Sequence, residues 1–212
     1  MHRHYSKLDH CLIQLDQGIR TIFNRPAEQR PNPAIDTPDT NISPSERKHS
    51  IGLMRVNHAG EISAQALYQA QALTARSAAT RTSMKQAAEE ENDHLAWCAQ
   101  RLEELGGHIS HLSSIWYLGS FAIGTLAGLA GDKWSLGFLA ETEEQVVRHL
   151  EAHLENLPSE DHKSRKIVSQ MRADESEHAT MAVEIGAVAL PKPIKKMMAL
   201  FSKVMTKTAY WV

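Results

Sequence analysis

Two Glu-x-x-His units are the most chemically suggestive feature of the sequence. One is Glu91 with His94, within EENDHLAWC, and the other is Glu175 with His178, within MRADESEHATM. Each unit lies on an apolar stripe of helical period, and side chains three residues apart on a helix are neighbours. A carboxylate and an imidazole on a buried stripe are costly unless something pairs with them. Two such groups one turn apart suit a metal ion.

Two single glutamates complete this pattern. Glu61 lies within LMRVNHAGEISAQALYQA, and Glu143 lies on the apolar stripe that runs through Ala140 and Val147. Two single glutamates with two Glu-x-x-His units form the ligand set of di-iron and di-manganese carboxylate four-helix bundles. We assign no catalytic residue beyond the metal ligands. The six candidate ligands are Glu61, Glu91, His94, Glu143, Glu175 and His178.

The spacing of the glutamates supports a shared centre. Thirty residues separate the two ligand glutamates of the first half of the pattern, and thirty-two separate those of the second half. The midpoints are residue 76, which begins a small polar stretch, and residue 159, which follows Pro158. If each half folds as an antiparallel helical hairpin, its two glutamates come to the same level along the axis of the bundle. The two halves therefore form a weak internal repeat.

Residues beside the ligands have less certain roles at this stage. His58 lies one turn before Glu61, and we expect it beside the metal rather than on it. Asp93 or Asp174 could orient a ligating imidazole, and spacing does not decide between them. Gly60 lowers helix stability by about 1 kcal/mol relative to alanine. Either close helix packing or room for a ligand beside Glu61 would explain that glycine.

Length and composition place the chain among single-domain, all-α proteins. Its 212 residues suit one domain with a sizeable core, and strand signals are nearly absent. The net charge of −2 gives no support for a nucleic-acid partner. Cys11 and Cys98 lie far apart and match no disulfide or zinc pattern. The N-terminus lacks the apolar run of a signal peptide, so we expect a cytoplasmic location.

Four helices must position the ligands, and caps and breakers mark their ends. Ser43, Pro44 and Glu46 form the pattern of a capping box at the start of the first helix. In the second helix, acids off the apolar stripe, such as Glu90, are expected to face solvent. Ser159 is the expected N-cap of the fourth helix. The expected ranges are about 43–76, 82–105, 135–158 and 159–190.

An apolar stretch separates the two halves of the predicted bundle. Residues 109–131 contain no Asp, Glu, Lys or Arg, and a bilayer-spanning helix needs about 20 residues. A spanning helix here would place the two hairpins on opposite sides of the membrane and destroy the shared centre. We therefore expect a long crossover helix that packs on the bundle, with part of it available to lipid.

The two ends of the chain differ from the bundle. Residues 1–42 are expected to form a lead with a short amphipathic helix and a proline-rich linker that lies on the surface. Residues 43–212 are expected to form the metal-binding domain. Its tail, from residue 192, alternates lysines with apolar residues at helical spacing, which is typical of a helix on a membrane surface.

The ligand set also indicates a type of chemistry. Nitrogen and oxygen donors with open positions suit iron or manganese. Two adjacent Fe(II) ions can supply two electrons to O2, while the protein supplies a dry pocket and a route for electrons. Together with the apolar crossover and the cationic tail, this chemistry favours oxidation of a lipid-soluble molecule taken from a membrane.

Four stretches of the chain resemble the bacterial type of demethoxyubiquinone hydroxylases. They are LMRVNHAGEISAQALYQAQ, EENDHLAWC, ETEEQVVRHL and MRADESEH, and the resemblance covers about residues 45–212. It implies a ferritin-like di-iron monooxygenase that hydroxylates a polyprenyl methoxy-benzoquinol with O2 and a reductant such as NADH. By match of motif, the six candidate ligands would hold two Fe2+ ions. Glu144 follows Glu143 directly, so that match could slip by one residue, although the apolar stripe favours Glu143.

The resemblance further implies a peripheral protein on the cytoplasmic side of the cell membrane. Its substrate would be a membrane-borne polyprenyl quinol, and its partners would be other ubiquinone-biosynthesis proteins. A ferritin-like iron-storage or peroxide-scavenging protein is the alternative, but storage predicts a hydrophilic surface that the crossover and tail do not favour. A purely structural bundle would pair its acids with basic residues, and no lysine or arginine lies on those stripes.

Overall fold

The computed structural model describes residues 6–23 and 28–212, and every regular element in these ranges is a helix. The predicted all-α class is confirmed. Residues 1–5 and 24–27 of the predicted lead, and the side chain of Cys11, lie outside the described residues. The helices are α1 (Lys7–Phe23), α2 (Pro44–Thr74), α3 (Ala78–Leu105), α4 (Ser113–Leu129), α5 (Asp132–Asn156), α6 (His162–Ile185) and α7 (Lys192–Ala209).

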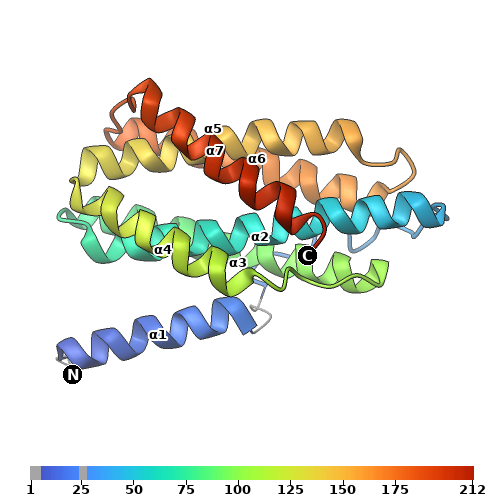
Figure 1. Ribbon diagram of the computed structural model, residues 1–212, viewed down its shortest axis with the longest axis horizontal. Coiled ribbons are helices and arrows are strands. Elements are labelled where there is room, and N and C mark those ends of the chain that lie inside the picture. Colours follow the sequence, from blue (N-terminus) through green and yellow to red (C-terminus); the bar gives the residue numbers. More distant parts are fainter. Residues whose placement is uncertain (1–5, 24–27) are drawn as a thin grey trace.

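Four of these helices, α2, α3, α5 and α6, form the bundle, which agrees with the predicted ferritin-like architecture. α2 packs against α3, α5 packs against α6, and α3 also meets α6. The connection from α3 to α5 carries α4, the predicted crossover, which lies along α2 and also contacts α5 (Figure 1). The two hairpins α2–α3 and α5–α6 therefore face each other.

Two of the three glycines of α4, Gly124 and Gly128, follow from its close contact with α2. A Cβ atom at Gly124 would lie 2.6 Å from the carbonyl oxygen of Leu67, and one at Gly128 would overlap the side chain of Thr74. Glycine allows the two backbones to approach this closely. Across residues 6–23 and 28–212, no helix combines the length and the apolar character that crossing a membrane requires.

Helix starts were predicted less well than helix existence. The capping box at Ser43 is present as predicted. α3 begins about one turn earlier than predicted, because the hydroxyl of Ser77 serves as its N-cap. α6 begins at His162, because the carboxylate of Asp161, rather than Ser159, accepts from its first turn. Both regions contain several residues that can cap a helix, so the local sequence did not select among them.

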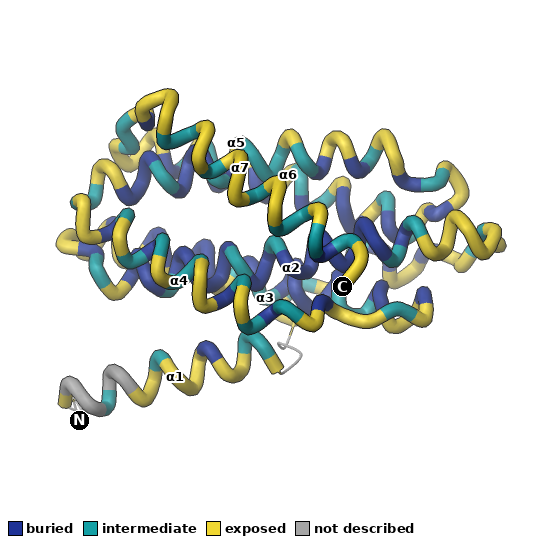
Figure 2. Tube along the Cα trace, viewed as in Figure 1, coloured by how far each residue is buried: buried dark blue, intermediate teal, exposed yellow. Residues whose placement is uncertain are grey.

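Two apolar layers fill the bundle on either side of its middle. One joins the N-terminal parts of α2 and α6 to the C-terminal parts of α3 and α5, and the other joins the opposite ends. Figure 2 marks the buried residues along these helices. The predicted ligands belong to the helix segments between these layers, so they lie where water is excluded. Members include Leu53, Met54, Trp97, Leu102, Leu150 and Met171 in the first layer, and Leu67, Tyr68, Met84, Leu136, Leu139 and Ala182 in the second.

α7, the predicted C-terminal helix, lies across α2 and α5 outside the bundle (Figure 1). Its end is anchored, because the Tyr210 hydroxyl bonds to Nδ1 of His49 and Arg55 donates to the Tyr210 carbonyl. A Cβ atom at Gly52 would collide with the Tyr210 ring. The rest of the helix presents apolar side chains to solvent. Met197, Leu200, Phe201 and Val204 are each more than half exposed.

The segment 28–42, predicted as a surface linker, is attached to α3 and α6. The side chains of Asn32 and Ala34 are buried. Asp39 forms ion pairs with Arg101 on α3 and with Lys163 on α6. These contacts hold the segment against the bundle at several points.

Two histidines of α5, the buried His153 and the partly buried His149, lie outside the cluster of predicted ligands. Burial lowers the pKa of His149 to about 4. Burial, together with the nearby His149 and His49, lowers the pKa of His153 to about 2. The pKa of histidine in an unfolded chain is about 6.5. The unfolded state therefore binds more protons at these positions below about pH 6.5, and stability falls as the pH is lowered.

We expect His153→Gln to make the fold less sensitive to acid. Between about pH 7.5 and about pH 5, His153 should cost the wild type about 2 kcal/mol of unfolding free energy, and the variant should escape this loss. Urea denaturation of both metal-free proteins at the two pH values gives the difference, in which other titrating groups cancel. The same pH dependence in both proteins would contradict the buried, neutral state of His153.

Candidate metal centre

The six predicted ligands meet in one buried cluster. None of them is more than 3% exposed. Their ligand atoms form two overlapping groups, and within each group all atoms lie within 4.8 Å of one another. Glu91 and Glu175 belong to both groups, so these two carboxylates are placed to bridge two ions. The groups are Glu61, Glu91, His94 and Glu175, and Glu91, Glu143, Glu175 and His178.

Both histidines turn Nδ1 into the cluster and Nε2 away from it. Nδ1 of each lies 3.0 Å from a carboxylate oxygen of the glutamate one turn before it. Nε2 of His94 donates to Asp174 at 2.9 Å, and Nε2 of His178 donates to Glu90 at 2.5 Å. These bonds keep a proton on Nε2, so Nδ1 is the nitrogen that would bind a metal once the metal displaces the Nδ1 proton.

The two outer acids are exchanged between the helices. Asp174 of α6 holds His94 of α3, while Glu90 of α3 holds His178 of α6. Each acid directly precedes one of the two glutamates shared by both ligand groups, and this position was the signal in the sequence. Of Asp93 and Asp174, the two candidates for orienting an imidazole, it is Asp174 that does so. The expectation that Glu90 faces solvent was wrong, because its carboxylate is turned to the histidine of the facing helix.

The buried carboxylates raise one another's proton affinity. Burial, and then the charge of Glu91, raises the pKa of Glu61 well above its ordinary value. Burial and the charge of Glu175 do the same to Glu143. Burial would also raise the pKa of Glu175, but in the metal-free site the positive charge of the two adjacent imidazoles outweighs it and holds that pKa at about 2. Charges buried this deeply are costly unless paired with opposite charge.

The donor set fits two divalent cations. Oε1 of Glu91 and Oε1 of Glu175 are buried and, within the described part of the chain, accept no hydrogen bond. These oxygens therefore retain lone pairs for coordination. Two divalent ions would bring four positive charges to four carboxylates, and carboxylate oxygen with imidazole nitrogen suits iron or manganese. The cluster can thus hold a pair of metal ions.

Tyr68 is a member of the site that the sequence analysis missed. Its buried hydroxyl donates to Oε1 of Glu143. Tyr68 lies two turns after Glu61 on the same side of α2, and this spacing was the only signal available. His58 is also buried, but it belongs to neither ligand group.

The geometry bears on two positions that the sequence left open. Glu144 is half exposed and pairs with Arg148, whereas Glu143 lies in the cluster. A Cβ atom at Gly60 would meet nothing within 4 Å, so close helix packing does not explain this glycine. Room for a ligand beside Glu61 stays a prediction.

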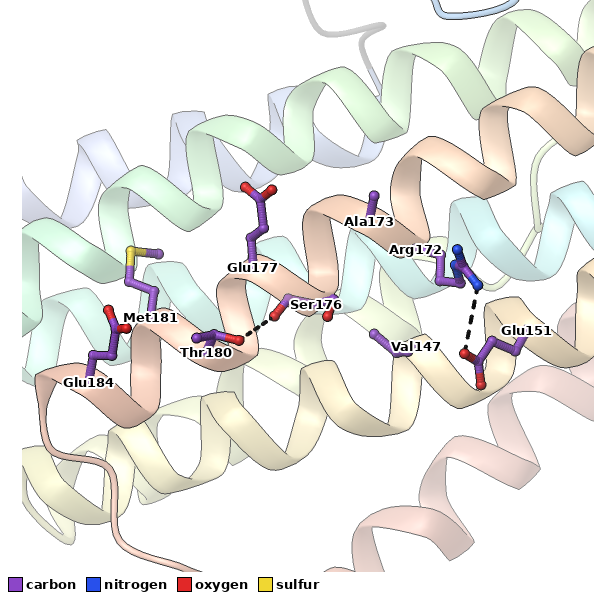
Figure 3. Close-up of a pocket in the computed structure, with 9 residues that line it drawn as sticks. All are labelled: Val147, Glu151, Arg172, Ala173, Ser176, Glu177, Thr180, Met181 and Glu184. Carbon is purple, nitrogen blue, oxygen red and sulfur yellow. Dashed lines mark hydrogen bonds and ion pairs between the residues drawn. The ribbon is translucent and has the colours of Figure 1, made fainter.

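Two hollows border α6. The larger, of about 620 Å³, lies between α5 and α6 and is lined by outward-facing side chains that include Glu151, Arg172 and Ser176 (Figure 3). The clustered residues of α6 are not among its walls. The smaller, of about 330 Å³, is lined by residues that include Glu90 and Asp174, and so lies directly outside the two histidines.

Comparison with known proteins decides the family. The model of the family described as "Ubiquinone biosynthesis protein COQ7" matches residues 48–209, a range that contains all six clustered residues. The chain belongs to this family. The resemblance seen in its sequence motifs is thereby confirmed.

Relatives of this COQ7-family chain are similar over almost their whole length. It is 55% identical to the 3-demethoxyubiquinol 3-hydroxylase of Nitrosococcus oceani, over 99% of both chains. It is 54% identical to the protein of the same name from Nitrosomonas eutropha, over 97% of this chain and 99% of the relative. It is 51% identical to the protein of the same name from Xanthomonas euvesicatoria, over 98% of this chain and 96% of the relative. These matches extend into the lead, which precedes the range of the family model.

Proposed function

We propose that the protein is a 3-demethoxyubiquinol 3-hydroxylase, an O2-dependent di-iron monooxygenase of ubiquinone biosynthesis. The observation that carries this proposal is the buried cluster of four glutamates and two histidines in a chain of the COQ7 family. The printed names of the relatives supply the reaction. The cluster supplies a place where two iron ions would bind.

The proposed reaction replaces a ring hydrogen of a polyprenyl methoxy-benzoquinol by a hydroxyl group. One atom of O2 enters the ring and the other leaves as water. This consumes two electrons from a reductant such as NADH and two protons, of which NADH supplies one and the solvent the other. When bound, a pair of Fe(II) ions would supply the binding and reduction of O2.

The chain's own residues position the donors and keep water out. Asp174 and Glu90 hold the histidine protons on Nε2, so that each Nδ1 faces the metal. Tyr68 keeps its hydroxyl proton directed at Glu143, which fixes that carboxylate at the edge of the cluster. The apolar layers on both sides exclude water, and electrostatic interactions are strengthened in such a site.

A membrane-borne quinol also requires contact with lipid. On α4, the exposed face carries Ile115, Leu118, Leu126 and Leu129, each at least 59% exposed. α7 adds a second apolar face together with several lysines, which suits an anionic lipid surface. These two faces support peripheral attachment to the cytoplasmic side of the cell membrane.

Extraction of quinones from cells that lack the protein tests the proposed reaction. We expect demethoxyubiquinone to accumulate and ubiquinone to fall, and expression of the wild-type chain to reverse both changes. Purified protein should contain about two iron ions per chain. Normal ubiquinone together with impaired iron handling would instead favour the ferritin-like storage alternative.

A further inference from the structure

Arg30 connects the N-terminal lead to the outer side of the metal centre. Its Nε lies 2.8 Å from Asp93 on α3, and its Nη2 lies 2.9 Å from Asp174 on α6. The guanidinium carbon is 5.1 Å from the centre of the Trp97 ring, and that ring lies 5.4 Å from the ring of His94. A single side chain thus joins the two helices that carry the Glu-x-x-His units.

Asp93 fixes the lead at this point. Its Oδ1 accepts from the backbone N–H groups of Gln29, at 2.6 Å, and of Arg30, at 3.3 Å, while its Oδ2 receives Nε of Arg30. Asp93 is 2% exposed, and a carboxylate buried this deeply is costly unless it is paired. The lead supplies both the backbone and the side-chain donors. Arg30 is therefore fixed at its backbone and Nε by Asp93, and its Nη2 extends to Asp174.

The two histidines differ in what holds their outer acids. Asp174, the partner of His94, is paired with the cation of Arg30 and also accepts from the Gln170 amide at 2.8 Å. Glu90, the partner of His178, accepts from the Gln86 amide at 3.0 Å and is about one-third exposed. In the described part of the chain, the ion pair with Arg30 therefore adds to the restraint on Asp174. Apart from its histidine, Glu90 is held by an amide alone.

We propose that Arg30 is a positioning residue that makes the two metal positions unequal, by holding Asp174 and through it His94. This inference rests on the proposed iron centre, but not on its substrate. The planar guanidinium engages two carboxylates at once, which keeps Asp174 from turning toward solvent.

The charge of Arg30 also has an opposing effect. The guanidinium draws negative charge from Asp174, which weakens the imidazole of His94 as a ligand. His94 nevertheless keeps a bond of 2.9 Å to this carboxylate. We infer that the fixed orientation is the larger effect, because Arg30 acts on His94 only through the carboxylate of Asp174 itself. Iron at the His94 position should therefore dissociate more slowly than iron at the His178 position.

Release of iron to a chelator tests this inference on the full chain. Protein loaded with Fe(II) without oxygen should release iron in two phases. Arg30→Ala should accelerate the slow phase about tenfold, at the lower end of the effect of outer-sphere partners on metal affinity. Arg30→Lys, which keeps the charge but not the planar fork, should accelerate it less. Lys163→Ala breaks another tie between the lead and α6, at Asp39, and should leave both phases unchanged.

A double-mutant cycle separates positioning from general loosening. Asp174→Asn should accelerate the slow phase, and adding Arg30→Ala should change it no further, because the arginine acts through that carboxylate. Circular dichroism verifies folding, and Arg30→Lys completes the same cycle if the alanine variant does not fold. Equal acceleration of both phases, wild-type release from the Arg30 variants, or additive effects would overturn the inference. A wild-type protein that binds no iron would refute the proposed function itself.

Discussion

Replacement of His178 by alanine is expected to abolish hydroxylation and to lower the iron content from about two ions per chain to about one or fewer. The reason is that His178 is the imidazole donor of one ligand group, which shares two glutamates with the other group. Iron analysis of the purified variant measures the loss. Its circular dichroism spectrum should stay helical, because the apolar layers lie on either side of this residue.

Glu177→Ala is a matched control for this experiment. Glu177 neighbours His178 in α6, but it is exposed and lines the surface hollows (Figure 3). This control should keep its iron and its activity. Full iron loading in His178→Ala would refute the role of His178 as a ligand, and unfolding of both variants would show that this part of α6 tolerates no change.

A variant in which Leu200, Phe201 and Val204 are all replaced by glutamate should bind membranes much more weakly than the wild type. Each of these side chains on α7 is more than half exposed. If they enter the lipid surface, their removal should weaken partitioning into anionic vesicles by about 100-fold, at about 1 kcal/mol for each side chain. Sedimentation of vesicles with the bound protein measures the partition coefficient.

The design of this variant follows from the anchoring of α7. Deletion of the tail would also remove Tyr210, whose contacts with His49 and Arg55 fasten α7 to α2. Substitutions at exposed positions keep those contacts. Val183→Glu is the control, since Val183 is 58% exposed but lies on α6. Unchanged partitioning of the α7 variant would assign the lipid contact to α4 or remove it from the proposal.

The sequence predicted the bundle and its inner ligands because both follow local periodicity. Glu143 was preferred to Glu144 because it lies on the apolar stripe of its helix, and the structure places only the former in the cluster. The crossover was recognised because a spanning helix would separate the hairpins. Gly124 and Gly128 within it, however, are explained only by contact with α2, which lies about 50 residues earlier in the sequence.

The outer parts of the site depend on how distant segments meet. Glu90 looked like a solvent-facing acid because nothing near it in the chain shows that α6 brings His178 against it. Asp93 looked similar, yet it receives the backbone of a segment more than sixty residues away. Hydrophobic periodicity describes which face of a helix is buried. It does not describe which polar groups two buried faces exchange.

The exchange of outer acids between α3 and α6 has a mechanical consequence. If one helix slid past the other by a single turn, Asp174 and Glu90 would both lose their histidines, and both imidazoles would be released together. The two crossed bonds can therefore form together in only one alignment of the two helices along their length.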